Sequence, residues 1–143
     1  MGPSGETLGY TNNPSLSADG RFVAISAQPV GSFTFNFYLR DRQTAQTMLV
    51  LANSGATSET LSGDGRFVSY SRGYGGTNYV EVYDRSMGLA TTISPGGVYY
   101  TAVGGNTIPF DSASPLVTGD TNGVSDSFVA PVGSDPGTPD PPP

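Results

Sequence analysis

The stretch GDTNGVSD, residues 119–126, places three oxygen-bearing side chains close together: Asp120, Asn122 and Asp126. Carboxylate and amide oxygens are the ligands that Ca²⁺ prefers, and Gly123 permits the sharp bend that such a loop needs. The spacing begins as a calcium-binding loop does, but Pro131 stands where that loop would place its bidentate glutamate. Two interpretations stay open: a calcium site formed by these three residues, and an Asn-Gly turn between two strands.

Two other carboxyl groups are candidates for catalysis. Glu59 and Glu81 would serve as the pair that glycoside hydrolysis requires on either side of the bond to be cut. Neither residue lies in a recognisable motif. The chain contains no His and no Cys, which excludes Ser–His–Asp and Cys–His mechanisms within it. We therefore expect no enzymatic activity and no cofactor, with calcium as the single candidate metal.

Two further segments have the composition of binding surfaces. RGYGGTNY, residues 72–79, is glycine-rich but lacks the Gly-x-Gly-x-x-Gly spacing and the following helix of a nucleotide-binding loop. A hairpin is the favoured interpretation. Tyr74, Tyr79, Tyr99 and Tyr100 offer an aromatic platform for sugars or peptides, although such residues more often pack between sheets.

The charge of the chain excludes two classes of partner. Its net charge is −6, and all six of its basic residues are Arg. Nucleic acids and anionic membrane surfaces both require clustered cations. No apolar run approaches the ~20 residues of a membrane-spanning helix. We expect neither nucleic-acid binding nor membrane insertion.

The elements that must position these residues are repeats. SLSADGRFVAIS, residues 15–26, returns as TLSGDGRFVSYS, residues 60–71, and FYLRDRQTAQTMLV, residues 37–50, returns as VEVYDRSMGLATTI, residues 80–93. A third copy is weaker, with GGNTIPFDS at 104–112 and DSFVAP at 126–131. A period of about 45 residues favours a propeller or a solenoid.

Each copy divides into short strands that alternate apolar residues on both faces. Phe22 and Ala24 fall on one face of a strand, and Val23 and Ile25 fall on the other, as expected of a sheet packed between two neighbours. The Asp-Gly dipeptides at 19–20 and 64–65 predict tight turns. The expected strands are Pro14–Ser17, Arg21–Ala27, Thr34–Arg40 and Thr47–Leu51; Thr57–Ser62, Arg66–Ser71, Asn78–Tyr83 and Ala90–Ile93; and Val98–Ala102, Asn106–Phe110 and Ser127–Ala130.

The Ser-x-Asp-Gly-Arg core, the following Asp-Arg and the later Asp-Thr-Asn-Gly resemble the WD40-like, TolB-type propeller repeats of bacterial proteins. The resemblance covers roughly residues 13–132 and implies an all-β fold in which each repeat is one four-stranded antiparallel blade. It also implies a bacterial-type protein of the cell envelope or the extracellular space, and it says little about function. The third copy departs from the pattern, because Pro131-Val132 replaces the Asp-Arg that ends the other two.

The repeats divide the chain into an N-terminal arm (1–12), three propeller repeats (about 13–56, 57–96 and 97–132) and a proline-rich tail (133–143). A propeller ring usually needs four to eight blades. The arm is a candidate strand for donation to another chain, which would complete either a closed six-bladed dimer or an open filament. A fragment of a longer propeller is the third possibility.

We therefore predict a non-catalytic, self-assembling extracellular module. The alternative is a propeller that binds a peptide or a glycan.

Overall fold

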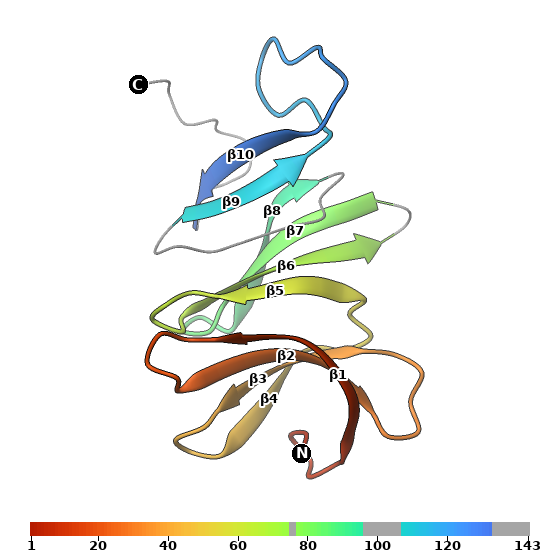
Figure 1. Ribbon diagram of the computed structural model, residues 1–143, viewed down its shortest axis with the longest axis vertical. Coiled ribbons are helices and arrows are strands. Elements are labelled where there is room, and N and C mark those ends of the chain that lie inside the picture. The colour runs from red at the N-terminus through yellow and green to blue at the C-terminus, as the bar shows by residue number, and fades with distance from the viewer. Residues whose placement is uncertain (75–76, 96–106, 133–143) are drawn as a thin grey trace.

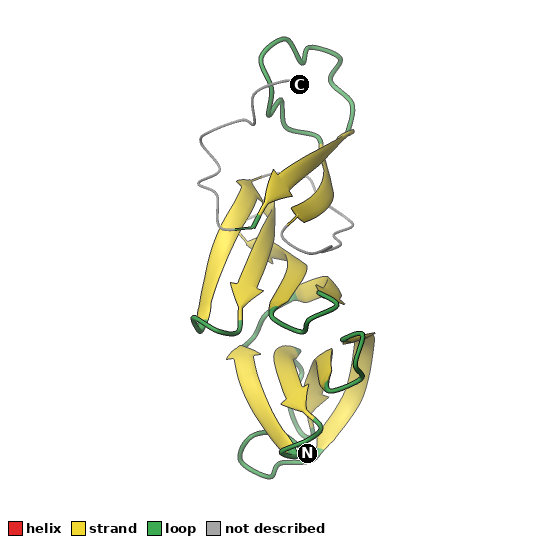
Figure 2. Ribbon diagram, turned by 90° about the vertical axis from the view of Figure 1, so that its left-hand side faces the viewer, coloured by secondary structure: helices red, strands yellow, loops and turns green. Residues whose placement is uncertain are grey.

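The computed structural model describes residues 1–74, 77–95 and 107–132, and its regular elements are antiparallel strands (Figure 1). Three sheets follow one another along the long axis, as the side view in Figure 2 shows. Within the described ranges no α-helix occurs, and none of these residues forms a helix suited to crossing a membrane. The all-β prediction is confirmed.

The first two sheets each contain four strands in sequential order, so that every strand pairs with the next one along the chain. We call the first sheet blade 1; its strands are β1 (Leu8–Leu16), β2 (Phe22–Pro29), β3 (Asn36–Asp41) and β4 (Gln46–Leu51). Blade 2 consists of β5 (Ala56–Leu61), β6 (Phe67–Tyr74), β7 (Thr77–Asp84) and β8 (Leu89–Pro95). These are the four-stranded antiparallel repeats that the sequence predicts.

The third repeat contributes a pair of strands, which we call blade 3: β9 (Thr107–Ser112) and β10 (Asp126–Pro131). Both strands lie where the sequence predicts them. The expected strand Val98–Ala102 and the tail 133–143 lie outside the described residues.

The Asp-Gly dipeptides form the predicted turns, and each turn is held by its own side chains. Gly20 and Gly65 have φ of 71° and 70°, a conformation that costs glycine little. In the first turn, the hydroxyl of Ser17 donates to Asp19 Oδ1 over 2.6 Å, and the amide of Arg21 donates to the same oxygen over 2.9 Å. The second turn repeats this pattern, so that the local sequence alone fixes the shape of both hairpins.

An arginine next to each turn ties it to the end of the third strand of its blade. Arg21 donates to both carboxylate oxygens of Asp41, with a closest distance of 2.7 Å, and Arg66 bonds Asp84 in the same way. The bond from Arg21 holds the pKa of Asp41 well below its usual range. Because both arginines are largely exposed, each ion pair adds modest stability and mainly sets geometry.

The core lies between the blades. In the first cluster Phe22 and Ala24 of blade 1 pack with Val68 and Tyr70 of blade 2, so one face of a blade meets the opposite face of the next. Phe37 and Tyr70 contact each other with ring centroids 5.2 Å apart. A second cluster joins blade 2 to blade 3. The prediction that the strands of the first two repeats carry apolar residues on both faces is confirmed.

The expected N-terminal arm is corrected by the structure. Residues 8–12 belong to β1 and pair with β2 of the same chain. The sequence predicted that this strand begins at Pro14. In the structure β1 begins at Leu8 and passes through two register shifts, around Gly9–Tyr10 and Asn13–Pro14, with Asn13 at a φ of 49°.

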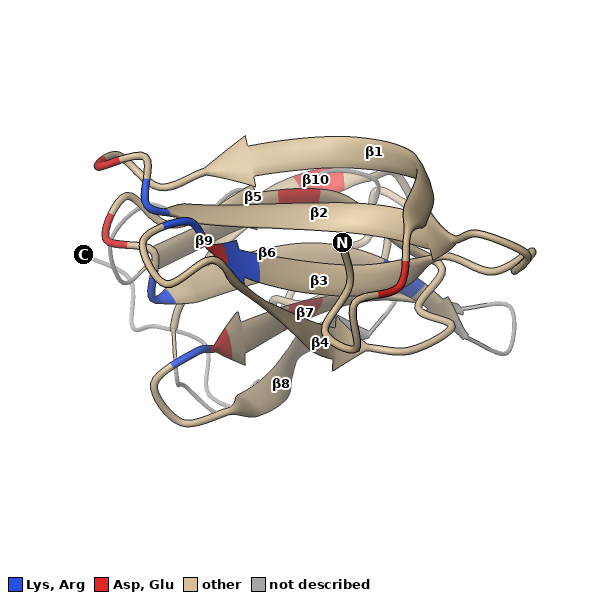
Figure 3. Cartoon of the chain, turned by 90° about the horizontal axis from the view of Figure 1, so that it is seen from below, with Lys and Arg blue, Asp and Glu red and all other residues tan. Residues whose placement is uncertain are grey.

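Residues 1–6, which we call the N-terminal strap, cross the face of blade 1 that points away from blade 2 (Figure 3). The hydroxyl of Thr47 in β4 donates to the carbonyl of Met1 over 3.0 Å, and Gly2 is buried. Tyr38, whose side chain lies on this same face, is also buried. The strap therefore covers part of a sheet face that no neighbouring blade covers among the described residues.

Candidate functional site

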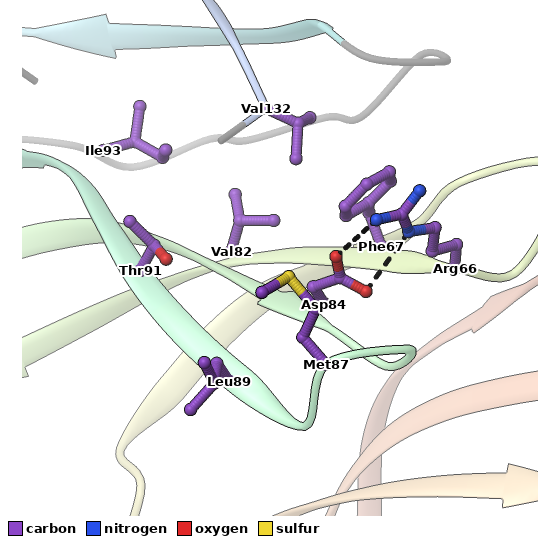
Figure 4. Close-up of a pocket in the computed structure, with 9 residues that line it drawn as sticks. All are labelled: Arg66, Phe67, Val82, Asp84, Met87, Leu89, Thr91, Ile93 and Val132. Carbon is purple, nitrogen blue, oxygen red and sulfur yellow. Dashed lines mark hydrogen bonds and ion pairs between the residues drawn. The ribbon is translucent and has the colours of Figure 1, made fainter. Parts of the chain in front are cut away.

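A groove of about 170 Å³ opens between the outer half of blade 2 and the end of β10 (Figure 4). Its walls are mostly apolar: Phe67, Val82, Ile93 and Val132 project into it, and Met87 and Leu89 form its exposed rim. The groove is continuous with the core between blades 2 and 3, because Phe67, Val82 and Ile93 belong to both. We call it the outer groove.

One ion pair borders the outer groove. Arg66 donates to Asp84 over 2.8 Å, and its guanidinium lies 4.5 Å from the centre of the Phe67 ring. The bond from Arg66 holds the pKa of Asp84 well below its usual range. Since this carboxylate is charged and already bonded, it is a poor proton donor or acceptor. The groove is therefore suited to binding an apolar group, not to acid–base chemistry.

A corresponding groove lies between blades 1 and 2. The groove there is lined by Phe22, Leu39 and Met48 at the positions of Phe67, Val82 and Thr91, and also by Arg85 of blade 2. The guanidinium of Arg85 lies 3.9 Å from the centre of the Phe22 ring, a cation–π contact between blades. Tyr83 is buried in the same interface, and its hydroxyl lies 3.7 Å from the sulfur of Met48.

Blade 3 lacks both of these side chains. Tyr83 pairs with Val68 across the sheet, and Ala130 pairs with Ile108, so Ala130 takes the place of Tyr83. Two residues further on, Val132 takes the place of Arg85. An alanine and a valine now stand where the first interface has a tyrosine and an arginine. The replacement of Asp-Arg by Pro131-Val132 was visible in the sequence, but the cavity beside it was not.

The three predicted calcium ligands line one shallow hollow together with Val117 and Phe128. Asn122 uses its amide nitrogen to donate to Asp126 over 3.0 Å and its amide oxygen to accept from the amide of Val124 over 2.9 Å. Gly119 and Gly123 both have positive φ, which gives the expected bend. Among the described residues no three His, Cys, Asp or Glu side chains converge on one point. Calcium binding stays a prediction.

Glu59 and Glu81 each have a structural partner. Glu59 is buried and accepts a hydrogen bond from the hydroxyl of Ser26 in blade 1, while its second oxygen, Oε2, has no partner among the described residues. Burial raises the pKa of Glu59, against the opposing effect of its hydrogen bonds. Glu81 accepts from Arg72 over 2.8 Å. Both carboxyl groups thus take part in the packing of blade 2.

The glycine-rich segment 72–79 is a hairpin, since β6 and β7 pair as far as Tyr74 and Thr77. Residues 75–76, at its tip, lie outside the described residues. Of the four tyrosines considered for an aromatic platform or for packing between blades, Tyr79 is half-buried in β7, and the side chain of Tyr74 lies outside the part of the chain that is described. Tyr99 and Tyr100 lie outside the described residues.

Comparison with known proteins identifies the fold. No family model matches the chain, and no curated protein matches it. Among solved structures, TolB from Acinetobacter baumannii is similar at a TM-score of 0.63 and 17% identity, over 87% of this chain and 30% of that one. The tricorn protease gives a TM-score of 0.68 at 19% identity, over 89% of this chain and 14% of that one.

The β-propeller domain of the Trilobed protease from Pyrococcus furiosus is similar at a TM-score of 0.62 and 12% identity, over 74% of this chain and 35% of that one. These likenesses show the fold alone: the chain has the fold of TolB-like β-propeller blades. It spans about a third of the length of TolB and of the Trilobed protease propeller, and much less of the tricorn protease.

Proposed function

We propose that this chain is a non-catalytic β-propeller module of the cell envelope or extracellular space, which associates with a second copy through the free face of blade 1. One observation carries the proposal. The face of blade 1 that points away from blade 2 has the same design as the face of blade 2 that receives blade 1.

The two faces correspond residue by residue. Val23 and Ile25 in blade 1 stand where blade 2 has Val68 and Tyr70, which are both fully buried against blade 1. Leu16 pairs with Val23, and Leu49 pairs with Tyr38, so both leucines lie on this face; they are 55% and 43% exposed. An apolar sheet face of this kind is typical of one that receives a neighbour.

Within the described part of blade 3, no aromatic residue stands at the position of Phe22 to make a head-to-tail contact. Thr107 stands where blades 1 and 2 have Phe22 and Phe67, and Pro109 replaces a small residue beside it. The symmetric contact, in which blade 1 of one copy packs on blade 1 of the other, is therefore favoured over a closed ring or a filament.

This route replaces the donation of an N-terminal strand. Residues 8–12 are committed to β1, and the N-terminal strap covers part of the free face. The N-terminal strap and the second copy of the chain would then compete for the free face of blade 1. Removal of residues 1–6 distinguishes the two routes. Strand donation predicts that the shortened chain forms the dimer more weakly, whereas packing through the free face of blade 1 predicts that it forms the dimer more strongly.

The test is the mass of the full chain in solution by light scattering over a range of concentrations. We expect a dimer that Leu49→Glu dissociates, because the substitution places a charge within the contact. Val124→Glu, a change of similar size at a residue 59% exposed in the loop before β10, should leave the dimer intact. A chain that stays monomeric at every concentration, with and without the strap, would refute the proposal.

Two observations support the proposed location of the protein and the proposed absence of catalysis. The repeats resemble those of bacterial envelope and secreted proteins, and the chain has no His or Cys to act as a base or a nucleophile. The buried carboxyls are engaged with Ser26 and Arg72. A second candidate function, binding of a peptide ligand, is favoured by the outer groove between blades 2 and 3.

A further inference from the structure

We propose that one end of blade 1 binds the surface of a lipid bilayer with zwitterionic head groups, through the loop between β2 and β3. We call residues 30–34 of this loop the blade 1 tip. The tip lies beyond the ends of the strands, so it is a different surface from the free face of blade 1. The proposal therefore holds whether or not the chain forms a dimer, and it can fail without affecting the proposed function.

The blade 1 tip carries apolar side chains that the core of the chain does not use. Phe33 is 97% exposed and Val30 is 69% exposed. The start of β1 lies beside them, because the amide of Val30 donates to the carbonyl of Thr7 over 3.1 Å, and Tyr10 in that strand is 78% exposed. Large apolar side chains that are exposed at one end of a blade mark an interaction surface. Tyrosine is also enriched where a bilayer meets water, because its ring is apolar and its hydroxyl is polar.

Hydrogen bonds within the chain fix the shape of the tip. The amide of Ser32 donates to the carbonyl of Pro29 over 2.9 Å, and Gly31 has a φ of 84°, which is the geometry of a type II turn. The hydroxyl of Thr34 donates to Asn53 Oδ1 over 2.8 Å, which ties the loop to the connection between β4 and β5. The apolar side chains are therefore presented on a formed loop, and little conformational entropy is lost when they bind.

The same hydrogen bonds lower the cost of removing the tip from water. The amides of Val30, Ser32 and Thr34 each have an acceptor within the chain, and the hydroxyls of Ser32 and Thr34 bond each other over 3.0 Å. A polar group that enters lipid without a hydrogen-bond partner is costly, so these internal bonds suit the tip to a lipid environment. They also use groups with which a protein partner would form the hydrogen bonds of a specific interface, which favours lipid over protein.

The distribution of charge selects the kind of lipid. The segment from Phe22 to Leu39, which includes the tip, contains no charged residue. In Figure 3 the loop between β2 and β3 projects to the right, and the red and blue segments of blade 1 lie mainly at the opposite end. An anionic surface is bound by clustered basic residues, and the tip has none. A zwitterionic surface requires no such residues, and the entry of the tip into its outer layer removes no charge from water.

The first test is co-sedimentation of the full chain with vesicles of phosphatidylcholine. We expect the wild type to sediment with these vesicles, and we expect Phe33→Ser to lower the partition coefficient about tenfold, since a phenylalanine ring that leaves water contributes about this factor. Met87→Ser is the matched control, because Met87 is 66% exposed and lies at the opposite end of the sheets, in the turn between β7 and β8. It should leave the partition coefficient unchanged, and both variants should keep the melting temperature of the wild type.

A second test places a fluorescent reporter at the tip. The chain contains no Trp, so Phe33→Trp and Met87→Trp each introduce a single indole. When phosphatidylcholine vesicles are added, the emission of Phe33→Trp should move to shorter wavelength, and the emission of Met87→Trp should stay unchanged. Vesicles with brominated acyl chains should quench the first variant and not the second.

Three results would overturn the proposal. The first is a wild type that does not sediment with phosphatidylcholine vesicles at any lipid concentration, or that does so only when anionic lipid is added. The second is an equal response of the two tryptophan variants to vesicles. The third is an emission of Phe33→Trp that moves with protein concentration in the absence of vesicles, which would assign the tip to a contact between copies of the chain.

Discussion

Glycines at matching positions of two turns provide a direct test of how the blades pack. Gly20 and Gly65 both follow the aspartate of an Asp-Gly turn, and their φ values differ by one degree, 71° against 70°. Their surroundings differ. A Cβ added at Gly20 would have Arg42 Nη1 as its nearest neighbour, at 3.6 Å, whereas a Cβ added at Gly65 would overlap the ring of Phe22 in blade 1.

The expected costs follow from this difference. Alanine in the left-handed conformation costs about 1 kcal/mol relative to glycine, and both substitutions share this cost. Gly65→Ala adds the displacement of a buried ring, which costs about 1–3 kcal/mol in a packed core. We therefore expect a loss of about 1 kcal/mol in the free energy of unfolding for Gly20→Ala and of about 2–4 kcal/mol for Gly65→Ala.

Urea unfolding measures both values, provided that the slope m is the same in the two variants. A cycle with Phe22→Leu adds the decisive control, because it removes the ring atoms that the new methyl group would overlap. In that background the cost of Gly65→Ala should fall to the cost of Gly20→Ala. Two results would refute the packing of blade 1 on blade 2 described above. One is an equal loss of stability for the two alanine variants in the wild-type background, and the other is a loss for Gly65→Ala that stays the same when Phe22 is replaced by leucine.

Two further predictions concern charge and calcium. Burial raises the pKa of Glu59 in the folded state. The free energy of unfolding should therefore fall as the pH rises above 4.5, the ordinary pKa of this carboxyl group, by no more than about 1.4 kcal/mol per pH unit. Glu59→Gln should remove this slope, as unfolding at pH 5 and pH 8 would show; an unchanged slope would exclude Glu59 as its source. If Asp120, Asn122 and Asp126 bind calcium, a chelator should lower the melting temperature of the wild type but not of Asp120→Ala. Equal melting temperatures with calcium and with chelator would remove the calcium hypothesis.

The repeats and their turns could be read from the sequence because local contacts fix them. The Asp-Gly turns are held by Ser17 and Asp19 within a few residues, and the Arg–Asp pairs join strands of one hairpin. The apolar residues along Phe22–Ile25 were enough to predict that both faces of a blade are apolar. These features do not depend on which blade follows, so the sequence of a single repeat is enough to predict them.

The extent of β1, the place of the strap and the outer groove depended on the tertiary structure. Register shifts at Asn13 let β1 start at Leu8, and no local pattern predicts a strand that is interrupted in this way. The outer groove requires two blades, since Phe67 and Thr91 of blade 2 line it together with Val132 at the end of β10. Sequence determines what each blade presents, but a cavity forms or closes only where the side chains of two separately folded sheets meet.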